Sequence, residues 1–301
     1  MNVHTIKDYA NNNKQQESNV HSLNVDNNNN NNQGNNVMRY FNREVFHFKT
    51  CSFIIICFLL KFYVVSVGIY YLYSMFKEKS WKCLLYQSGA LQIGKFVNEF
   101  KIWNLVTAMF LHNDLMHFLS NTLSLIFISF YVEFLINSTV YFLLFFFATG
   151  IYGNITSLLF NGNNISIGIS GVILGLCGYL IIYFIIEYNK MENNQKICFG
   201  IFIGVIILNF FVSIFISEQI EIYAHIGGLA SGILLAIILF LSSSPLYKFS
   251  HIASEKVLKI IKYICIVLLV LYPIISLCVI FTGKYPNVES LICKVESKTN
   301  I

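Results

Sequence analysis

Charged side chains are scarce in this 301-residue chain, and that scarcity excludes an ordinary water-soluble domain. Lys, Arg, Asp and Glu together make up 12% of the residues, against 56% hydrophobic residues, whereas soluble domains average roughly 25% charged residues. The net charge of +5 is modest and does not indicate nucleic-acid binding. The chain has no CxxC or HExxH pattern, so we expect no metal site and no cofactor.

Aspartate is nearly absent, and none lies in a long apolar stretch. The three aspartates are Asp8, Asp26 and Asp114. This excludes a catalytic pair of membrane aspartates, in which two carboxylates share a proton. It also means that a serine–histidine pair in the membrane would lack an aspartate to orient the imidazole.

The eight cysteines show no pairing pattern. Cys83 and Cys293 fall in segments that we place on the same side of the membrane, so a disulfide between them is possible, but spacing alone does not fix connectivity and we expect them to be unpaired. The other six lie in or beside apolar stretches, where we expect them to act as small packing residues: Cys51, Cys57, Cys177, Cys198, Cys265 and Cys278.

What the sequence does contain is seven apolar stretches of membrane-spanning length, since a helix needs about 20 apolar residues to cross a bilayer. They cover roughly residues 51–75, 117–136, 140–160, 169–187, 198–217, 223–243 and 260–282. Backbone polar groups in lipid must be satisfied within the segment, and no short strands of alternating polarity occur. We therefore predict an all-α protein embedded in the lipid bilayer.

The rest of the chain divides around these spans. Residues 1–48 are predicted to be a disordered, Asn-rich cytoplasmic tail. Residues 49–243 hold six spans, residues 244–283 a loop and the seventh span, and residues 284–301 a C-terminal tail. The distribution of Lys and Arg favours a cytoplasmic N-terminus.

Ser170 and His225 lie at the starts of the fourth and sixth spans, where a bilayer penalises polar groups without partners. His117 and Asn121 start the second span. Because these three spans are separated by even numbers of crossings, they begin on the same membrane face. The four polar residues are therefore expected at one depth.

Small residues follow both the serine and the histidine at helical spacing. Gly171 and Gly175 form one GxxxG step, and Gly228 and Gly232 form another. Such steps let two membrane helices approach closely. A packing role alone would account for the glycines, but not for a serine and a histidine at matching positions.

This combination predicts nucleophilic catalysis. A serine hydroxyl needs a base to remove its proton, and His225 is the best-placed base for Ser170. His117, Asn121 and the backbone N–H of Ser170 are candidate donors to a developing oxyanion. His112 is expected to form local hydrogen bonds at the start of the helix.

At this point the residues resemble a known family, the rhomboid intramembrane serine proteases, over roughly residues 84–243. The matching motifs are Trp103, the loop 107–112 that ends in His112, His117, Asn121, Gly168-Ile169-Ser170-Gly171 and Ala224-His225-x2-Gly228-x3-Gly232. The resemblance implies six core helices around a water-filled cavity. The seventh span, which contains Pro273, is similar to the extra C-terminal helix of many eukaryotic members.

The resemblance also implies roles. Ser170 would be the nucleophile and His225 the general base, with His117, Asn121 and the Ser170 amide holding the oxyanion. Structural support would come from Gly168, Gly171, His112, Trp103, Gly228 and Gly232. Substrates would be single-pass transmembrane proteins, admitted by the fifth span and the loop near 215–223. The active site would face the lumen or exterior, in the secretory pathway or plasma membrane.

Two positions depart from the family pattern. Its first-loop Trp-Arg pair is Trp103-Asn104 here, and Leu174 stands where many members have an aromatic residue that stacks on the catalytic histidine. Neither change removes a reacting group.

Two alternatives to the protease remain. One is a rhomboid-like protein that binds membrane clients without cleaving them, which would have no need for Ser170 and His225. The other is a transporter or channel, which would predict charged residues midway through the spans and repeat symmetry. The sequence indicates no oligomeric state.

Overall fold

The structure is a computed structural model. It describes residues 81–113, 115–161, 164–194, 196–197, 199–201, 203–204, 222–243, 249 and 252–293. The polar tail and the first predicted span lie outside these residues, as do most of the fifth span and the loop expected to admit substrates. Within the described part, five of the seven predicted spans are confirmed as helices long and apolar enough to cross a membrane.

The long helices are α5 (Leu115–Ile136), α6 (Thr139–Phe160), α7 (Ser170–Glu187), α9 (Ile222–Ser243) and α10 (Glu255–Thr282). The short elements are α2 (Trp81–Gln87), α3 (Ile93–Asn98), α4 (Asn104–Thr107), the 3-10 turns η1 (Ala108–Phe110) and η2 (Tyr188–Lys190), and α11 (Glu289–Ile292). Apart from one isolated bridge between Leu91 and Ser166, the regular structure in the described residues is helical. The predicted all-α class is confirmed.

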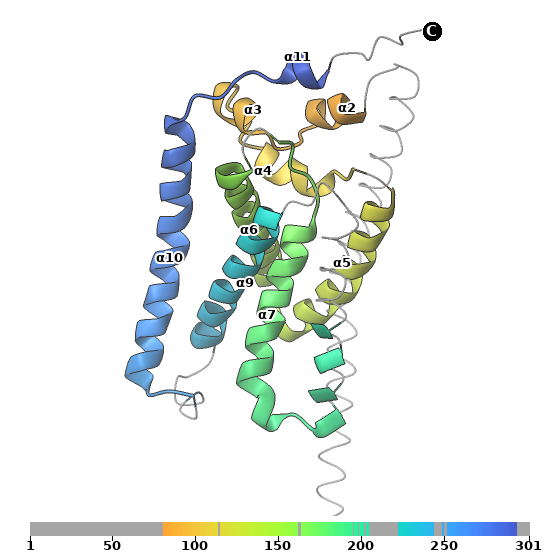
Figure 1. The fold of residues 1–301 in the computed structure, drawn as a ribbon. Coiled ribbons are helices and arrows are strands. Elements are labelled where there is room, and N and C mark those ends of the chain that lie inside the picture. Colours follow the sequence, from red (N-terminus) through yellow and green to blue (C-terminus); the bar gives the residue numbers. More distant parts are fainter. Residues whose placement is uncertain are drawn as a thin grey trace, which may run out of the picture. The chain divides into compact units, whose positions relative to one another are not determined.

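The short helices gather at one end of the long ones. Figure 1 shows α2, α3, α4 and α11 at the end where α10 finishes and where α7 and α9 begin. At this end an apolar cluster joins α3 and η1 to the ends of α6 and α10, and it consists of Leu91, Ile93, Phe96, Ala108, Leu158 and Ile280. We call this end of the molecule the loop end.

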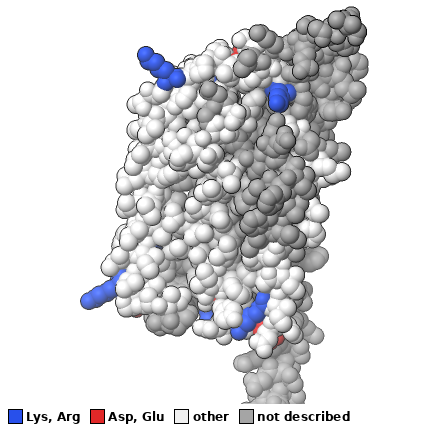
Figure 2. Space-filling model, in the orientation of Figure 1, with Lys and Arg blue, Asp and Glu red and all other residues white. Residues whose placement is uncertain are grey.

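An uncharged belt separates the charged ends of the molecule. On the face drawn in Figure 2, Lys and Arg side chains of the described residues lie near the two ends, and the described surface between them is white. Large apolar side chains such as Val267 and Ile274 of α10 point outward from this belt. Exposed apolar faces of this length are what a hydrocarbon environment requires, and the chain is an integral, multi-pass membrane protein.

Helices α7 and α9 meet through glycines. A Cβ on Gly228 would overlap the backbone of Gly171, and a Cβ on Gly232 would overlap the backbone of Gly175. The two predicted GxxxG steps therefore face each other, backbone against backbone, as small residues in membrane helices allow. We call this contact the glycine seam.

Helix α6 completes the packing around the seam. A Cβ on Gly153 would lie 2.7 Å from the carbonyl oxygen of Ala224 in α9, and one on Gly171 would lie 3.9 Å from the Cα of Gly153. Asn154 is buried and donates a 2.7 Å hydrogen bond from Nδ2 to the carbonyl of Leu105. Three helices thus converge near the start of α9, and Asn154 ties α6 to the loop end.

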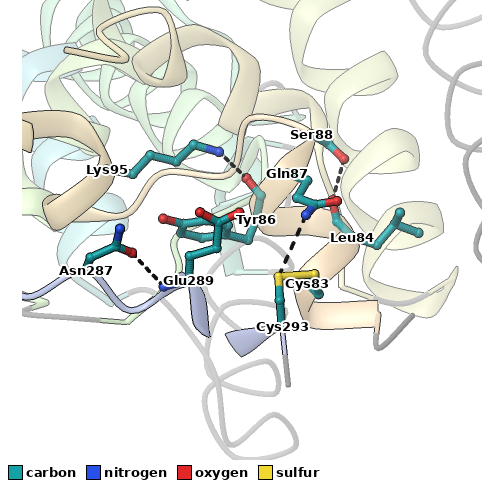
Figure 3. Close-up of a disulfide and its surroundings, with 9 residues drawn as sticks. All are labelled: Cys83, Leu84, Tyr86, Gln87, Ser88, Lys95, Asn287, Glu289 and Cys293. Carbon is teal, nitrogen blue, oxygen red and sulfur yellow. Dashed lines mark hydrogen bonds between the residues drawn. A yellow bond between two sulfur atoms is a disulfide. The ribbon is translucent and has the colours of Figure 1, made fainter. Parts of the chain in front are cut away.

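The expectation that Cys83 and Cys293 are unpaired is wrong, because the two form a disulfide between α2 and the residue after α11. Their Cα atoms lie 4.6 Å apart although 210 positions separate them in the chain. Figure 3 shows Gln87 beside the sulfurs, with its Nε2 4.0 Å from the Sγ of Cys293. Spacing could not predict this pair, because the fold alone returns the C-terminal tail to the loop end.

Candidate active site

Ser170 and His225 lie together across the glycine seam. Ser170 is the first residue of α7 and His225 the fourth of α9, and the Ser170 Oγ and His225 Nε2 atoms are 2.6 Å apart. His225 is only 6% exposed. This is the distance at which a histidine nitrogen accepts a serine proton. The shared depth inferred from span parity therefore corresponds to direct contact.

The loop that carries Ser170 is fastened by main-chain hydrogen bonds. Leu91 and Ser166 exchange two of them, at 3.0 and 2.8 Å, and the Gly168 N–H donates to the Ala108 carbonyl at 2.9 Å. Gly168 has a φ of +116°, a conformation that residues with a Cβ rarely adopt. No residue pattern marks this bridge in the sequence, because an isolated main-chain pairing leaves no side-chain pattern.

His117 and Asn121 border the same loop. A Cβ on Gly168 would lie 3.3 Å from Cε1 of His117 and 3.9 Å from Nδ2 of Asn121. Asn121 is buried, and within the described residues its Nδ2 has no hydrogen-bond partner. Leaving a buried donor unpaired costs about 1–3 kcal/mol, so this amide is a group for which a ligand oxygen would compensate.

The start of α7 contributes further donors. Its first intrahelical bonds run from the Val172 and Ile173 N–H groups to the Ile169 carbonyl. The Ser170 and Gly171 amides precede these, in the part of a helix where N–H groups have no intrahelical acceptor. They add to the positive end of the helix dipole beside the Ser170 hydroxyl.

His112 is buried and packs against His117. The two rings meet edge to face, with centroids 5.0 Å apart, and His112 makes a similar contact with Phe118. Burial, together with the neighbouring His117, lowers the pKa of His112 to about 3. The His112 imidazole is therefore neutral at physiological pH and packs against His117 without a competing charge.

The neighbouring first-loop residues Trp103 and Asn104 differ in exposure. Trp103 is 53% exposed, with the Lys101 ammonium 5.0 Å from the centre of its ring. Asn104 is buried and donates from Nδ2 to the Ala90 carbonyl at 3.0 Å. Asn104 thus braces the turn after α2, at the position where the family pattern has arginine.

The carboxylates of Glu133 and Glu187 are engaged away from the Ser170–His225 pair. Glu133, near the end of α5, accepts a 3.0 Å hydrogen bond from Thr139. Glu187, the last residue of α7, forms a 2.9 Å ion pair with Lys190. Both lie at the opposite ends of their helices from the Ser170–His225 pair. No group of three or more His, Cys, Asp or Glu side chains suited to a metal ion occurs among the described residues.

This geometry defines a class of protein: a polytopic helical membrane protein in which a serine and a histidine are in contact at one end of the core. Residues 99–242 match the family model of the Rhomboid domain. This part of the chain is a rhomboid domain. The matched segment contains all the motif residues discussed above.

Similar proteins include both a named protease and a named inactive protein. The chain is 32% identical over 162 residues to RHOMBOID-like protein 1 of Arabidopsis thaliana, covering 51% of this chain and 39% of that protein. It is 28% identical to Rhomboid-like protease 3 of Toxoplasma gondii, covering 49% and 55%. It is also 28% identical to Inactive RHOMBOID-like protein 8 of Arabidopsis, covering 48% and 40%. The match thus spans about half the length of these relatives or less.

Proposed function

We propose that this protein is an intramembrane serine endopeptidase that cleaves the transmembrane segments of single-pass membrane proteins. The observation that carries the proposal is the 2.6 Å contact between Ser170 Oγ and His225 Nε2 in the core of a membrane protein. A serine and a histidine in contact are the minimum equipment for acyl transfer.

The proposed reaction has two stages. As Ser170 Oγ attacks the peptide carbonyl carbon, His225 Nε2 takes the hydroxyl proton. The tetrahedral intermediate then collapses, the C–N bond breaks, and His225 gives that proton to the leaving amine. Water, deprotonated by His225, hydrolyses the acyl-enzyme and regenerates Ser170.

Negative charge on the substrate oxygen is stabilised by donors around the serine. Three donors border the Gly168 loop: the Asn121 Nδ2, which has no hydrogen-bond partner among the residues that the structure describes, the Ser170 backbone N–H and the His117 imidazole. Donors held in place before the reaction cost no reorganisation when the charge develops. The buried Asn121 amide supports this role, because its unmet hydrogen-bonding capacity is directed to the loop that carries the nucleophile.

The active site belongs, in this proposal, on the lumenal or exterior side of its membrane. The Cys83–Cys293 disulfide lies at the loop end, the same end as Ser170 and His225. Disulfides persist in oxidising compartments and are rare in the cytosol. The pair therefore supports the orientation that the Lys and Arg distribution favours, in the secretory pathway or plasma membrane.

Co-expression with a panel of single-pass membrane substrates tests the proposal. Wild type is compared with Ser170→Ala and His225→Ala, and Ser242→Ala serves as the matched control because its exposed hydroxyl bonds only to its own helix. We expect cleavage by wild type and the control, and none by the two site variants at equal expression. Cleavage that survives Ser170→Ala would refute the mechanism.

The second candidate is client binding without proteolysis. The similarity to a relative named as inactive favours keeping it. The same panel separates the two functions, because a binding protein would retain clients in wild type and in Ser170→Ala alike and would release no fragment from either.

A further inference from the structure

A proline in the middle of α10 frees a backbone carbonyl. Pro273 has no N–H, so the carbonyl four residues earlier, that of Leu269, loses its helical partner. The hydroxyl of Tyr152 in α6 donates to this Leu269 carbonyl. The defect in α10 is thus satisfied by a side chain from the neighbouring helix.

A second hydrogen bond runs in the opposite direction between the same helices. The hydroxyls of Tyr272 in α10 and Thr156 in α6 are 2.7 Å apart. Thr156 donates its proton to the Tyr152 carbonyl at 2.8 Å, so Tyr272 donates to Thr156. The Tyr152 and Tyr272 rings stack, with centroids 6.2 Å apart and planes inclined by 17°. We call Tyr152, Thr156, Leu269 and Tyr272 the tyrosine clasp.

The α6 side of the clasp supports the helix that carries His225. A Cβ on Gly227 would lie 2.7 Å from the Cβ of Thr156 and 2.9 Å from the carbonyl oxygen of Tyr152. Gly227 comes two residues after His225 and one before Gly228, which faces α7 across the glycine seam. The first turns of α9 are therefore held between α7 on one side and the clasped turn of α6 on the other.

We propose that Thr156 and Tyr272 are positioning residues for the Ser170–His225 reaction. Through their hydrogen bond, α10 sets the position of the His225 imidazole. The inference rests on the proposed function for its effect on rate. Hydrogen bonds that fix the Tyr152–Thr156 turn fix the surface against which Gly227 rests. A small displacement of that surface moves the imidazole relative to the Ser170 hydroxyl, and such displacements have large effects on rate.

The test uses variants that remove single hydroxyls. Tyr272→Phe and Thr156→Val each delete one end of the Tyr272–Thr156 bond and keep nearly the same volume. Thr156→Ser restores the hydroxyl and is the conservative rescue. Tyr263→Phe is the matched control, because Tyr263 lies on the exposed face of α10.

Two measurements on the full-length protein in detergent separate positioning from general support. The first is the saturation kinetics of Ser170 with a fluorophosphonate, in which the Oγ–P bond forms, fluoride leaves and His225 takes the serine proton. The second is amide hydrogen exchange of residues 222–228, which does not depend on catalysis.

We expect Tyr272→Phe and Thr156→Val to lower the limiting rate of phosphonylation about five- to tenfold with an unchanged half-saturating concentration. Exchange should accelerate in residues 222–228 and stay unchanged in α5. Thr156→Ser and Tyr263→Phe should behave as wild type.

Unchanged rates and exchange, equal losses in Thr156→Ser and Thr156→Val, or faster exchange in every helix would overturn the inference. A wild type that does not react with the fluorophosphonate would count against the proposed function instead. In that case the exchange of residues 222–228 would still decide whether the clasp holds α9.

Discussion

The glycine seam and its surroundings hold the site together in different ways. At the seam, Gly171 faces Gly228 and Gly175 faces Gly232, with no side chain between the two backbones. Around it, α5, α6, α10 and the C-terminal tail attach through side chains, namely imidazoles, amides, hydroxyls and one disulfide.

The difference separates what must be rigid from what can vary. Two backbones in contact have no rotamers, so the distance between the starts of α7 and α9 is set without side-chain entropy. Side-chain attachments cost such entropy, and each can be lost singly. We therefore expect substitutions in the seam to have the largest effects, and substitutions in the surroundings to have smaller and separable ones.

The seam is broken most directly by one methyl group. Gly228→Ala places a Cβ inside the backbone of Gly171, and we expect a loss of about 3 kcal/mol in unfolding free energy from overpacking, with loss of Ser170 reactivity. Thermal unfolding and fluorophosphonate labelling measure the two effects. Gly200→Ala is the control: within the described part of the chain its Cβ would meet nothing within 4 Å, so it should be neutral or slightly stabilising. Equal effects of Gly228→Ala and Gly200→Ala on unfolding and labelling would contradict a close backbone contact at the seam.

Asn121→Ala sharpens the comparison by altering the surroundings at the site without touching the seam. Removal of one oxyanion donor typically lowers the rate about 10²–10³-fold, and we expect a loss of this size in peptide cleavage. Stability should not fall with it, because the buried Nδ2 has no partner in the described residues. The exposed neighbour Ser120 provides the control variant Ser120→Ala. A rate unchanged by Asn121→Ala would remove this residue from the proposed mechanism.

Cys293→Ser detaches the tail from the loop end. The disulfide closes a loop of 210 positions, and its removal should cost about 2–4 kcal/mol of unfolding free energy. A reductant should lower the unfolding temperature of wild type but not of the variant. Cys278→Ser, at an exposed free cysteine, should retain the wild-type response. If the reductant fully reduces the disulfide of the wild type and the unfolding temperature does not change, the disulfide contributes no stability.

The smallest expected effect is a pH dependence from His112. Its pKa is lowered to about 3 in the folded protein, by burial and by His117, so the unfolded chain binds the proton more readily. This contribution to stability is complete above about pH 6.5 and declines as the pH falls, by at most about 1.4 kcal/mol per pH unit. Thermal unfolding at pH 7.5 and 5.5 should therefore differ more in wild type than in His112→Gln. If stability changes equally between the two pH values in wild type and in His112→Gln, His112 does not cause the pH dependence.

The spans and the depth of the site were predictable because lipid restricts the choices. Five predicted spans recur as helices within about two residues at most boundaries, although α10 begins at Glu255, five residues before its predicted start. Histidine is rare in such spans, and the glycines that follow Ser170 and His225 set these two residues apart from the other polar residues of the spans. Span parity then placed them at one end without any knowledge of packing.

The pairing of distant segments was not predictable. The Leu91–Ser166 bridge uses main-chain atoms, so no residue pattern marks it. Cys83 and Cys293 have no informative spacing. The role of Asn104 also depended on the fold, because only its burial beside the Ala90 carbonyl shows what an amide does in place of a guanidinium.

By itself, the sequence determined the membrane class, the five spans that the structure describes and the choice of Ser170 and His225, because hydrophobic length and the cost of polar groups in lipid act locally along the chain. Only the tertiary structure decided how these parts meet: which glycines face each other, which carbonyl Pro273 releases to Tyr152, and which two cysteines pair. Those contacts join residues far apart in the chain, and their energies depend on positions in space that no local pattern records.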